Sequence, residues 1–247
     1  MGWVFAANAV TFLVSVLALR VVPIAPPDRA GDGPRFTAEL AAGLRYARDN
    51  RTLARLLFFA VVVNAGFAGP VNVGLPLLSQ AEGWGGGGLG LMLGALGAGA
   101  TAGAALLGFG LIPGAGSGPL MITMTAGQAL FTLVAGLTRP LPAMVAALGG
   151  LGFFLTVAGS SAISLLQAIT DRAMLGRVGS LMSFAILGLT PVTYAACGSI
   201  AGWTGARPLL LAGGVIQAVA VVWALGSPAL RRISVGKSRA PGGGAAH

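Results

Sequence analysis

Seven long apolar runs, nearly free of charged side chains, constrain this chain more than any other feature of its sequence. A helix needs about 20 consecutive, mostly apolar residues to cross a bilayer. Only 9% of the residues are charged, against about 25% in soluble domains. The sequence therefore predicts an all-α, polytopic integral membrane protein with about seven transmembrane helices. The predicted spans are residues 3–22, 56–78, 89–112, 120–137, 141–169, 178–203 and 208–225.

The basic residues predict the orientation of these spans. Cytoplasmic loops of membrane proteins are enriched in Lys and Arg, and the connection between the first two spans is strongly basic. With that connection in the cytoplasm, alternation places Glu82, Arg139 and Arg207 outside and thirteen of the fifteen Lys and Arg inside. We expect a multi-pass protein of the cell membrane with its N-terminus outside and its C-terminus in the cytoplasm. The basic connection contains Arg20, Arg29, Arg35, Arg45, Arg48, Arg51 and Arg55.

The same pattern predicts four parts of the chain. Residues 1–24 hold the first span, residues 25–55 a cytoplasmic connection, residues 56–226 six further spans, and residues 227–247 a basic, disordered tail with little to bury. Within the connection, apolar residues recur at helical spacing, which predicts an amphipathic helix. This helix either lies in the membrane interface or covers a cytoplasmic face of the protein. The recurring residues are Phe36, Leu40, Leu44 and Ala47.

The residues that usually carry catalysis or bind metals are almost absent. The only histidine, His247, is terminal and the only cysteine is Cys197, so the sequence offers no histidine-based catalysis, no metal site and no disulfide. We predict neither an enzyme nor a cofactor. The net charge of +9 follows the predicted topology, so it does not indicate a nucleic-acid partner.

Two glycine pairs in the third span have the spacing of close helix crossings. Gly90 with Gly94, and Gly99 with Gly103, each lie four residues apart on one helical face. Small residues at this spacing let the backbones of two membrane helices approach each other. We therefore expect both pairs to pack against neighbouring helices.

Neutral polar residues are the candidate cavity-lining groups of the spans. An unsatisfied amide or hydroxyl is penalised in lipid, so such side chains turn toward the protein interior. There they either line a cavity or bond neighbouring helices, and the sequence leaves both roles open. Four of them follow one helical face at positions 156, 160, 164 and 167. The candidates are Asn8, Asn64, Asn72, Gln128, Thr156, Ser160, Ser164, Gln167 and Gln217.

Four segments in order along residues 8–226 resemble major facilitator superfamily (MFS) exporters of the enterobactin-exporter and macrolide-efflux type. The segments are NAVTFLVSVLAL (8–19), FTAELAAGLRYARDNRTL (36–53), GPVNVGLPLL (69–78) and DRAMLGRVGS (171–180). The resemblance implies helix six and the C-terminal six-helix domain of an alternating-access transporter. The loop GFGLIPGAGSGPL departs from the family pattern because it lacks the usual charged gate.

The resemblance also implies a role for the loop around residue 171. In the family, this short acidic and basic loop ties neighbouring helices at the cytoplasmic face in one state and releases them in the other. Asp171, Arg172 and Arg177 are thus candidate gate residues. The alternative is that both arginines only anchor the topology.

Two functions remain open from the sequence. The chain is either a component of an exporter of small amphiphilic molecules, of the drug or siderophore class, or a truncated membrane subunit that interacts with other proteins without transporting. The expected partners are the lipid bilayer, a small-molecule substrate, and either a missing N-terminal MFS half or a second copy of the chain.

Overall fold

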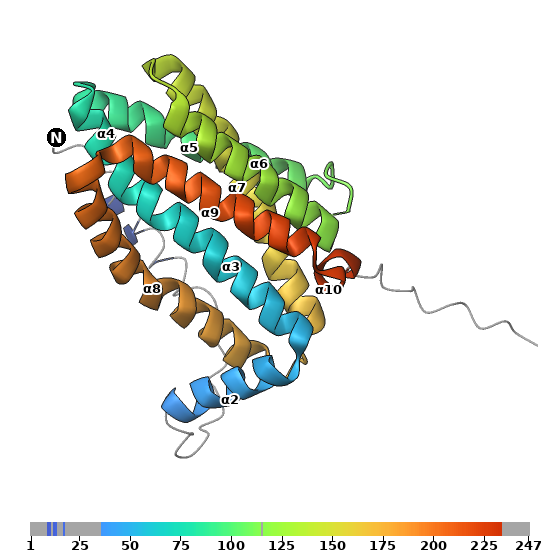
Figure 1. Cartoon of the computed structure of the whole chain (residues 1–247). Coiled ribbons are helices and arrows are strands. Elements are labelled where there is room, and N and C mark those ends of the chain that lie inside the picture. The colour runs from blue at the N-terminus through green and yellow to red at the C-terminus, as the bar shows by residue number, and fades with distance from the viewer. Residues whose placement is uncertain (1–8, 11, 14–16, 18–35, 115, 234–247) are drawn as a thin grey trace, which may run out of the picture. The chain divides into compact units, whose positions relative to one another are not determined.

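A computed structural model describes residues 9–10, 12–13, 17, 36–114 and 116–233 (Figure 1). Contacts divide the chain into residues 1–37 and residues 38–247, and the second unit contains the helical bundle. Of the expected first span, only residues 9, 10, 12, 13 and 17 are described, and these are helical. Asn8 lies outside the described residues.

Every element of the described residues is a helix, and six helical segments are long and apolar enough to cross a membrane. The prediction of an all-α polytopic membrane protein is confirmed. The elements are α2 (Phe36–Asp49), α3 (Arg51–Gly69), η1 (Pro70–Gly74), α4 (Leu75–Ala81), α5 (Gly85–Gly108), α6 (Gly118–Leu137), α7 (Leu141–Ile169), α8 (Leu175–Thr204), α9 (Ala206–Leu225) and α10 (Pro228–Arg232).

Several helices begin before the apolar runs that predicted them, α7 matches its predicted span, and α5 ends at Gly108 rather than at residue 112. Asn50 caps α3, since its side-chain oxygen accepts from the backbone N–H groups of Thr52 and Leu53, each at 3.2 Å. Gly205 has φ +84°, which lets the chain turn directly from α8 into α9. The residues added at the starts of α3, α8 and α9 include arginines, whose guanidinium groups can reach the headgroup region.

The second predicted span is a helix with an internal π-turn, η1, between α3 and α4. The sequence predicted the span without this irregularity. Pro70 has no N–H to donate to the carbonyl of Gly66, four residues before it. Gln217 of α9 supplies a donor instead, with its Nε2 3.0 Å from the Gly66 oxygen. The proline thus opens the helical ladder, and a side chain from another helix closes it.

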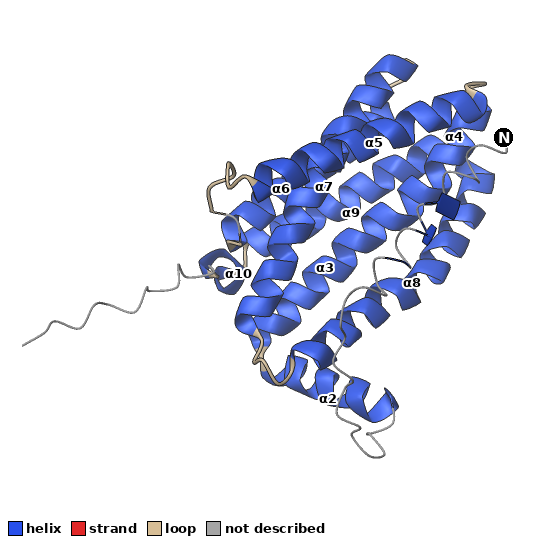
Figure 2. Cartoon of the chain, turned by 180° about the vertical axis from the view of Figure 1, so that it is seen from behind, coloured by secondary structure: helices blue, strands red, loops and turns tan. Residues whose placement is uncertain are grey.

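The bundle is built from a few helix pairs (Figure 2). Helix α7 packs against α5 and α6, α9 packs against α6 and α3, and α8 packs mainly against α3. Two apolar clusters fill the interior, one around Leu53, Met121 and Leu165 and the other around Leu75, Leu148 and Leu210. Burial is uneven, because α5 and α8 expose most of their surface.

Glycines set the α5–α7 crossing. A Cβ on Gly99 would collide with the carbonyl oxygen of Gly149, and one on Gly103 would lie 2.9 Å from the carbonyl oxygen of Phe153. The packing role predicted for Gly99 and Gly103 is therefore confirmed. The same prediction for Gly90 and Gly94 is wrong for this bundle, because no described atom lies within 4 Å of a Cβ at either position.

The connections gather at two ends of the bundle, as the predicted alternation requires. At one end, Arg207 Nη2 lies 2.8 Å from Glu82 Oε1, and Arg207 Nη1 donates to the carbonyl of Thr138. At the other end, the backbone N–H of Gly118 donates to the carbonyl of Ile233 at 2.8 Å. Which end faces the cytoplasm stays a prediction.

The first residues of the expected tail are structured, which corrects the boundary at residue 227. Residues 228–232 form α10, which packs on α6 and α9. Leu230 is fully buried, and Gly118 lies so close that a Cβ there would collide with the Leu230 carbonyl. The buried Leu230 and the hydrogen bond between Gly118 and Ile233 thus hold this basic segment on the bundle.

Replacement by leucine should have different effects at a packed glycine of α5 and at an open one. Gly99→Leu should lower the melting temperature of the detergent-solubilised chain by roughly 5–10 °C, because the side chain enters the α5–α7 crossing. Gly94→Leu should leave it nearly unchanged, because the added atoms meet open space. Thermal unfolding followed by size-exclusion chromatography measures both. Equal losses for the two variants would contradict the crossing.

Reporter fusions test the predicted orientation. Topology reporters at one end of the bundle should read cytoplasm, and those at the other end should read the outside, because thirteen positive charges favour retention. A cytoplasmic signal after Glu82 would reverse the assignment. The cytoplasmic fusions follow Arg51, Met174 and Lys237, and the outside fusions follow Glu82, Arg139 and Arg207.

Candidate functional site

A cavity of about 190 Å³ lies between α3, α6, α7 and α8. Most of its wall is apolar, with Phe59 and Val63 from α3, Met121 from α6 and Ile186 from α8. The wall on α7 includes the small residue Gly159, which leaves room between the helices. The bundle therefore holds a partly open apolar cavity that four different helices build.

Three polar side chains interrupt this apolar wall: Asn64, Thr125 and Gln128. Thr125 donates its hydroxyl to the carbonyl of Met121 at 2.8 Å, one turn earlier in α6. Gln128 is 1% exposed, and its Nε2 has no hydrogen-bond partner among the described residues. Gln128 thus brings to the cavity wall a buried amide donor that the surrounding helices leave unused.

Two of the predicted polar residues, Asn64 and Gln128, meet in this cavity. Sequence inspection missed Thr125, although it lies three residues before Gln128 and so shares its helical face. The apolar wall residues carry no signal of their own, because methionine and phenylalanine are as common in a closed core as in a cavity. Only the packing of four helices singles them out.

Other predicted polar residues bond backbone rather than line this cavity. Gln217 is fully buried and ties α9 to α3 through the Gly66 carbonyl. Asn72 is exposed, and its Nδ2 donates to the carbonyl of Ala68 at 2.9 Å, within the irregular turn. These two amides stabilise the helix pair and the π-turn.

The polar stripe of α7 lies on a different face from the cavity. Thr156 is half-buried, whereas Ser160, Ser164 and Gln167 are exposed. Ser160 and Ser164 line a shallow groove beside Leu107 of α5. The structure therefore separates this stripe from Asn64 and Gln128, and a role in binding stays a prediction for it.

The predicted gate loop contacts α2 through a tyrosine. The hydroxyl of Tyr46 donates to Asp171 Oδ2 at 3.0 Å and accepts from the backbone N–H of Asp171 at 3.2 Å. Arg172 is exposed, and Arg177 contacts Met174 rather than Asp171, with its Nη1 3.5 Å from Sδ. Glu82–Arg207 is the one ion pair among the described residues. The gating role of the loop stays a prediction, and Tyr46 is the hydrogen-bond partner of Asp171.

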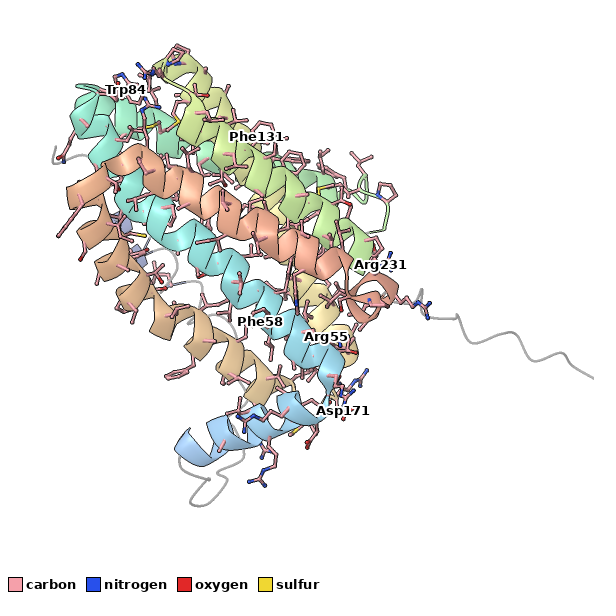
Figure 3. The ribbon with its side chains drawn as sticks, viewed as in Figure 1. Arg55, Phe58, Trp84, Phe131, Asp171 and Arg231 are labelled. Carbon is pink, nitrogen blue, oxygen red and sulfur yellow. The ribbon has the colours of Figure 1, made fainter. Side chains whose placement is uncertain are left out.

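Helix α2 lies close against the start of α8. A Cβ on Gly43 would lie 3.0 Å from the carbonyl oxygen of Arg177, and Ala47 is 4% exposed. Leu44, which the periodicity places with Ala47, is exposed instead. The face that contacts protein is therefore centred on Gly43 and Ala47, and Asp171 lies beside this helix (Figure 3).

A bundle of membrane-crossing helices around a cavity is the architecture of membrane transport proteins. The model of the MFS_3 family, described as transmembrane secretion effector, matches residues 1–237. The chain belongs to this family and is an MFS-type membrane transport protein. Comparisons with curated proteins and with solved structures gave no match.

Removing the tyrosine hydroxyl should loosen α2. In a Cys197→Ser background with Ala47→Cys as a reporter, Tyr46→Phe should raise the thiol-modification rate about two- to fivefold, because a hydrogen bond to a charged group is lost. Asp171→Asn should act in the same direction. Arg172→Gln is the matched control, since Arg172 makes no described contact with α2. Unchanged rates for Tyr46→Phe would mean that the bond does not hold the helix.

Proposed function

We propose that this chain supplies the C-terminal half of an exporter that moves small amphiphilic molecules by alternating access. The enterobactin-exporter and macrolide-efflux type, which the sequence resembles, is the closest guide to the substrate class. Membership of the transmembrane secretion effector family supports export. The observation that carries the proposal is an uncovered glycine face on α5.

This glycine face consists of Gly86, Gly90, Gly94 and Gly97, which follow one side of α5 at intervals of three and four residues. No described atom lies within 4 Å of a Cβ at any of these positions. Only 11% of the α5 span is buried inside the bundle. The described helices therefore leave this side of α5 entirely open.

Lipid contact alone does not account for such a face. A lipid-facing surface needs apolar side chains, but not small ones, and each glycine weakens a helix by about 1 kcal/mol relative to alanine. Glycines at this spacing are typical of helices whose backbones approach a partner closely. The glycine face is thus suited to a second helix, as Gly99 and Gly103 already are on the side toward α7.

The partner that we propose is an N-terminal six-helix half of the same type. In the transporters that the chain resembles, substrate is held between two such halves, and rocking exposes it to alternate sides of the membrane. Helix α8 supports the same view, because only 6% of its span is buried and Leu187 is 68% exposed. The bundle would then form one wall of the substrate pathway between the two halves.

The predicted gate fits this scheme at the cytoplasmic end. Asp171 lies where α7 turns into α8, and Tyr46 connects it to α2. Rocking of the halves would strain or release this contact, so the connection between the halves would take part in gating. No Asp, Glu, Lys, Arg or His lines the cavity among the described residues. If the exporter is proton-coupled, the proton-carrying side chains would therefore lie elsewhere.

Reconstitution tests the proposal. Liposomes that contain only the 247-residue chain should show no substrate-dependent flux for a panel of amphiphilic dyes, because one bundle forms one wall. Co-reconstitution with the N-terminal half of a family member should give flux. Gly94→Leu should reduce flux and copurification about tenfold, because a side chain in a close helix crossing costs 1–3 kcal/mol. Val219→Leu, on an exposed face of α9, is the control.

Three other outcomes would change the conclusion. Flux from a monomer of the chain would refute the half-transporter proposal. Flux that appears only with a dimer would replace the N-terminal half by a second copy. Copurification with a partner half without any flux would favour a membrane interaction subunit.

A further inference from the structure

We propose that the cavity between α3, α6, α7 and α8 binds an uncharged, mainly apolar molecule that presents one hydrogen-bond acceptor to Nε2 of Gln128. A ketone or ester carbonyl is the acceptor chemistry that fits. This inference rests on the proposed function, because such molecules would be the exported substrates. It narrows the broad class of small amphiphilic molecules that the resemblance implies.

The size and wall of the cavity define the apolar part of the ligand. Its volume of about 190 Å³ exceeds that of a cavity that binds benzene, about 150 Å³. Phe67, Leu155 and Met182 line the cavity and present aromatic, hydrocarbon and thioether surface, respectively. A molecule with two small rings is of suitable size. Met121 and Met182 lie on different helices, and their flexible side chains can adapt to its shape.

Gln128 defines the polar part. It lies in the middle of α6, is 1% exposed, and its Nε2 has no partner among the described residues. An amide donor buried without a partner is costly, most of all inside a membrane. A carbonyl oxygen from a ligand would remove that cost. The donor therefore favours a ligand with an acceptor over a plain hydrocarbon.

Two other buried donors in the bundle already have hydrogen-bond partners, unlike Nε2 of Gln128. Gln217 is equally buried, but its Nε2 bonds the Gly66 carbonyl and so serves the packing of α3 on α9. The Thr125 hydroxyl, which is also in the cavity, is already donated to Met121. Of these two buried glutamines, Gln128 is the one whose amide nitrogen makes no hydrogen bond to another helix.

The charge of the ligand follows from the same wall. No described residue that lines the cavity is ionisable. A cation or anion would lose its hydration there without gaining an opposite charge, which is strongly unfavourable. The cavity therefore selects neutral molecules, although the surface at one end of the chain is rich in arginine.

Benzophenone is a suitable probe, because it is neutral, has two rings and one carbonyl, and labels methionine when irradiated. With the purified full chain in detergent, labelling of Met121 and Met182 should saturate. Met92 and Met144, which lie outside the cavity in the other apolar cluster, should show only unsaturable background. Peptide mass spectrometry locates the label. Equal labelling of all four methionines would overturn the proposal.

The matched variants isolate the hydrogen bond. Gln128→Leu should raise the half-saturating benzophenone concentration about fivefold, the effect of losing one neutral hydrogen bond. Gln167→Leu makes the same exchange at an exposed position of α7 outside the cavity and should change nothing. A shift below twofold for Gln128→Leu would overturn the role of the donor.

Competition with benzophenone in the wild-type chain tests the same hydrogen bond even if the Gln128→Leu variant does not fold. Phenyl benzoate, which has an ester carbonyl, should displace benzophenone about fivefold better than diphenylmethane, which has no acceptor. Phenyltrimethylammonium should not compete. In a folded Gln128→Leu chain, the difference between the two neutral competitors should vanish. Equal competition in the wild-type chain, or competition by the cation, would overturn the proposal.

This experiment is independent of transport. Labelling needs only the chain in detergent. The expected labelling, together with no flux when the chain is co-reconstituted with an N-terminal half, would remove the exporter proposal and leave the site. Flux of neutral carbonyl compounds without saturable labelling at Met121 would remove the site and leave the exporter proposal.

Discussion

Close approach between helix backbones is the constraint on which the rest of this structure depends. In hydrocarbon, each helix satisfies its own backbone, and helices associate through packing rather than through the exclusion of water. Gly99 and Gly152 let α5 and α7 touch along their carbonyl groups, and Gly66 and Gly213 do the same for α3 and α9. These contacts fix the positions of α7 and α9, and through them the space that becomes the cavity.

The buried amides show how one type of side chain has different roles in this setting. Gln217 bonds a carbonyl that Pro70 leaves without its helical donor, so its conformation follows from a break in another helix. Gln128 has an unused donor beside apolar walls. The difference lies in the surroundings, since both are single glutamines in apolar helices. A proposal about binding therefore has to start from which donors the fold has already used.

The two ends of the bundle are held by contacts between parts that are far apart in the sequence. Glu82 and Arg207 join the turn after α4 to the start of α9, while Tyr46 and Asp171 join α2 to the turn before α8. Both contacts are partly exposed, so each is weak and easily exchanged with water. The gating role proposed for Asp171 requires a contact of this kind, which can form and break at little cost.

The sequence by itself determined the fold class, the number of long apolar helices from residue 51 on and their approximate bounds, because the length and polarity of a bilayer-crossing helix are read directly from composition. It also singled out Gly99, Gly103, Asn64 and Gln128 by spacing and polarity. It could not distinguish the role of Gln128 from that of Gln217, or the role of Gly99 from that of Gly94. It also could not identify the residue that bonds Asp171. Those distinctions depend on which helix faces which, and a periodic pattern describes each helix without its neighbours. Only the packed bundle decided that one amide bonds a backbone and another lies in a cavity.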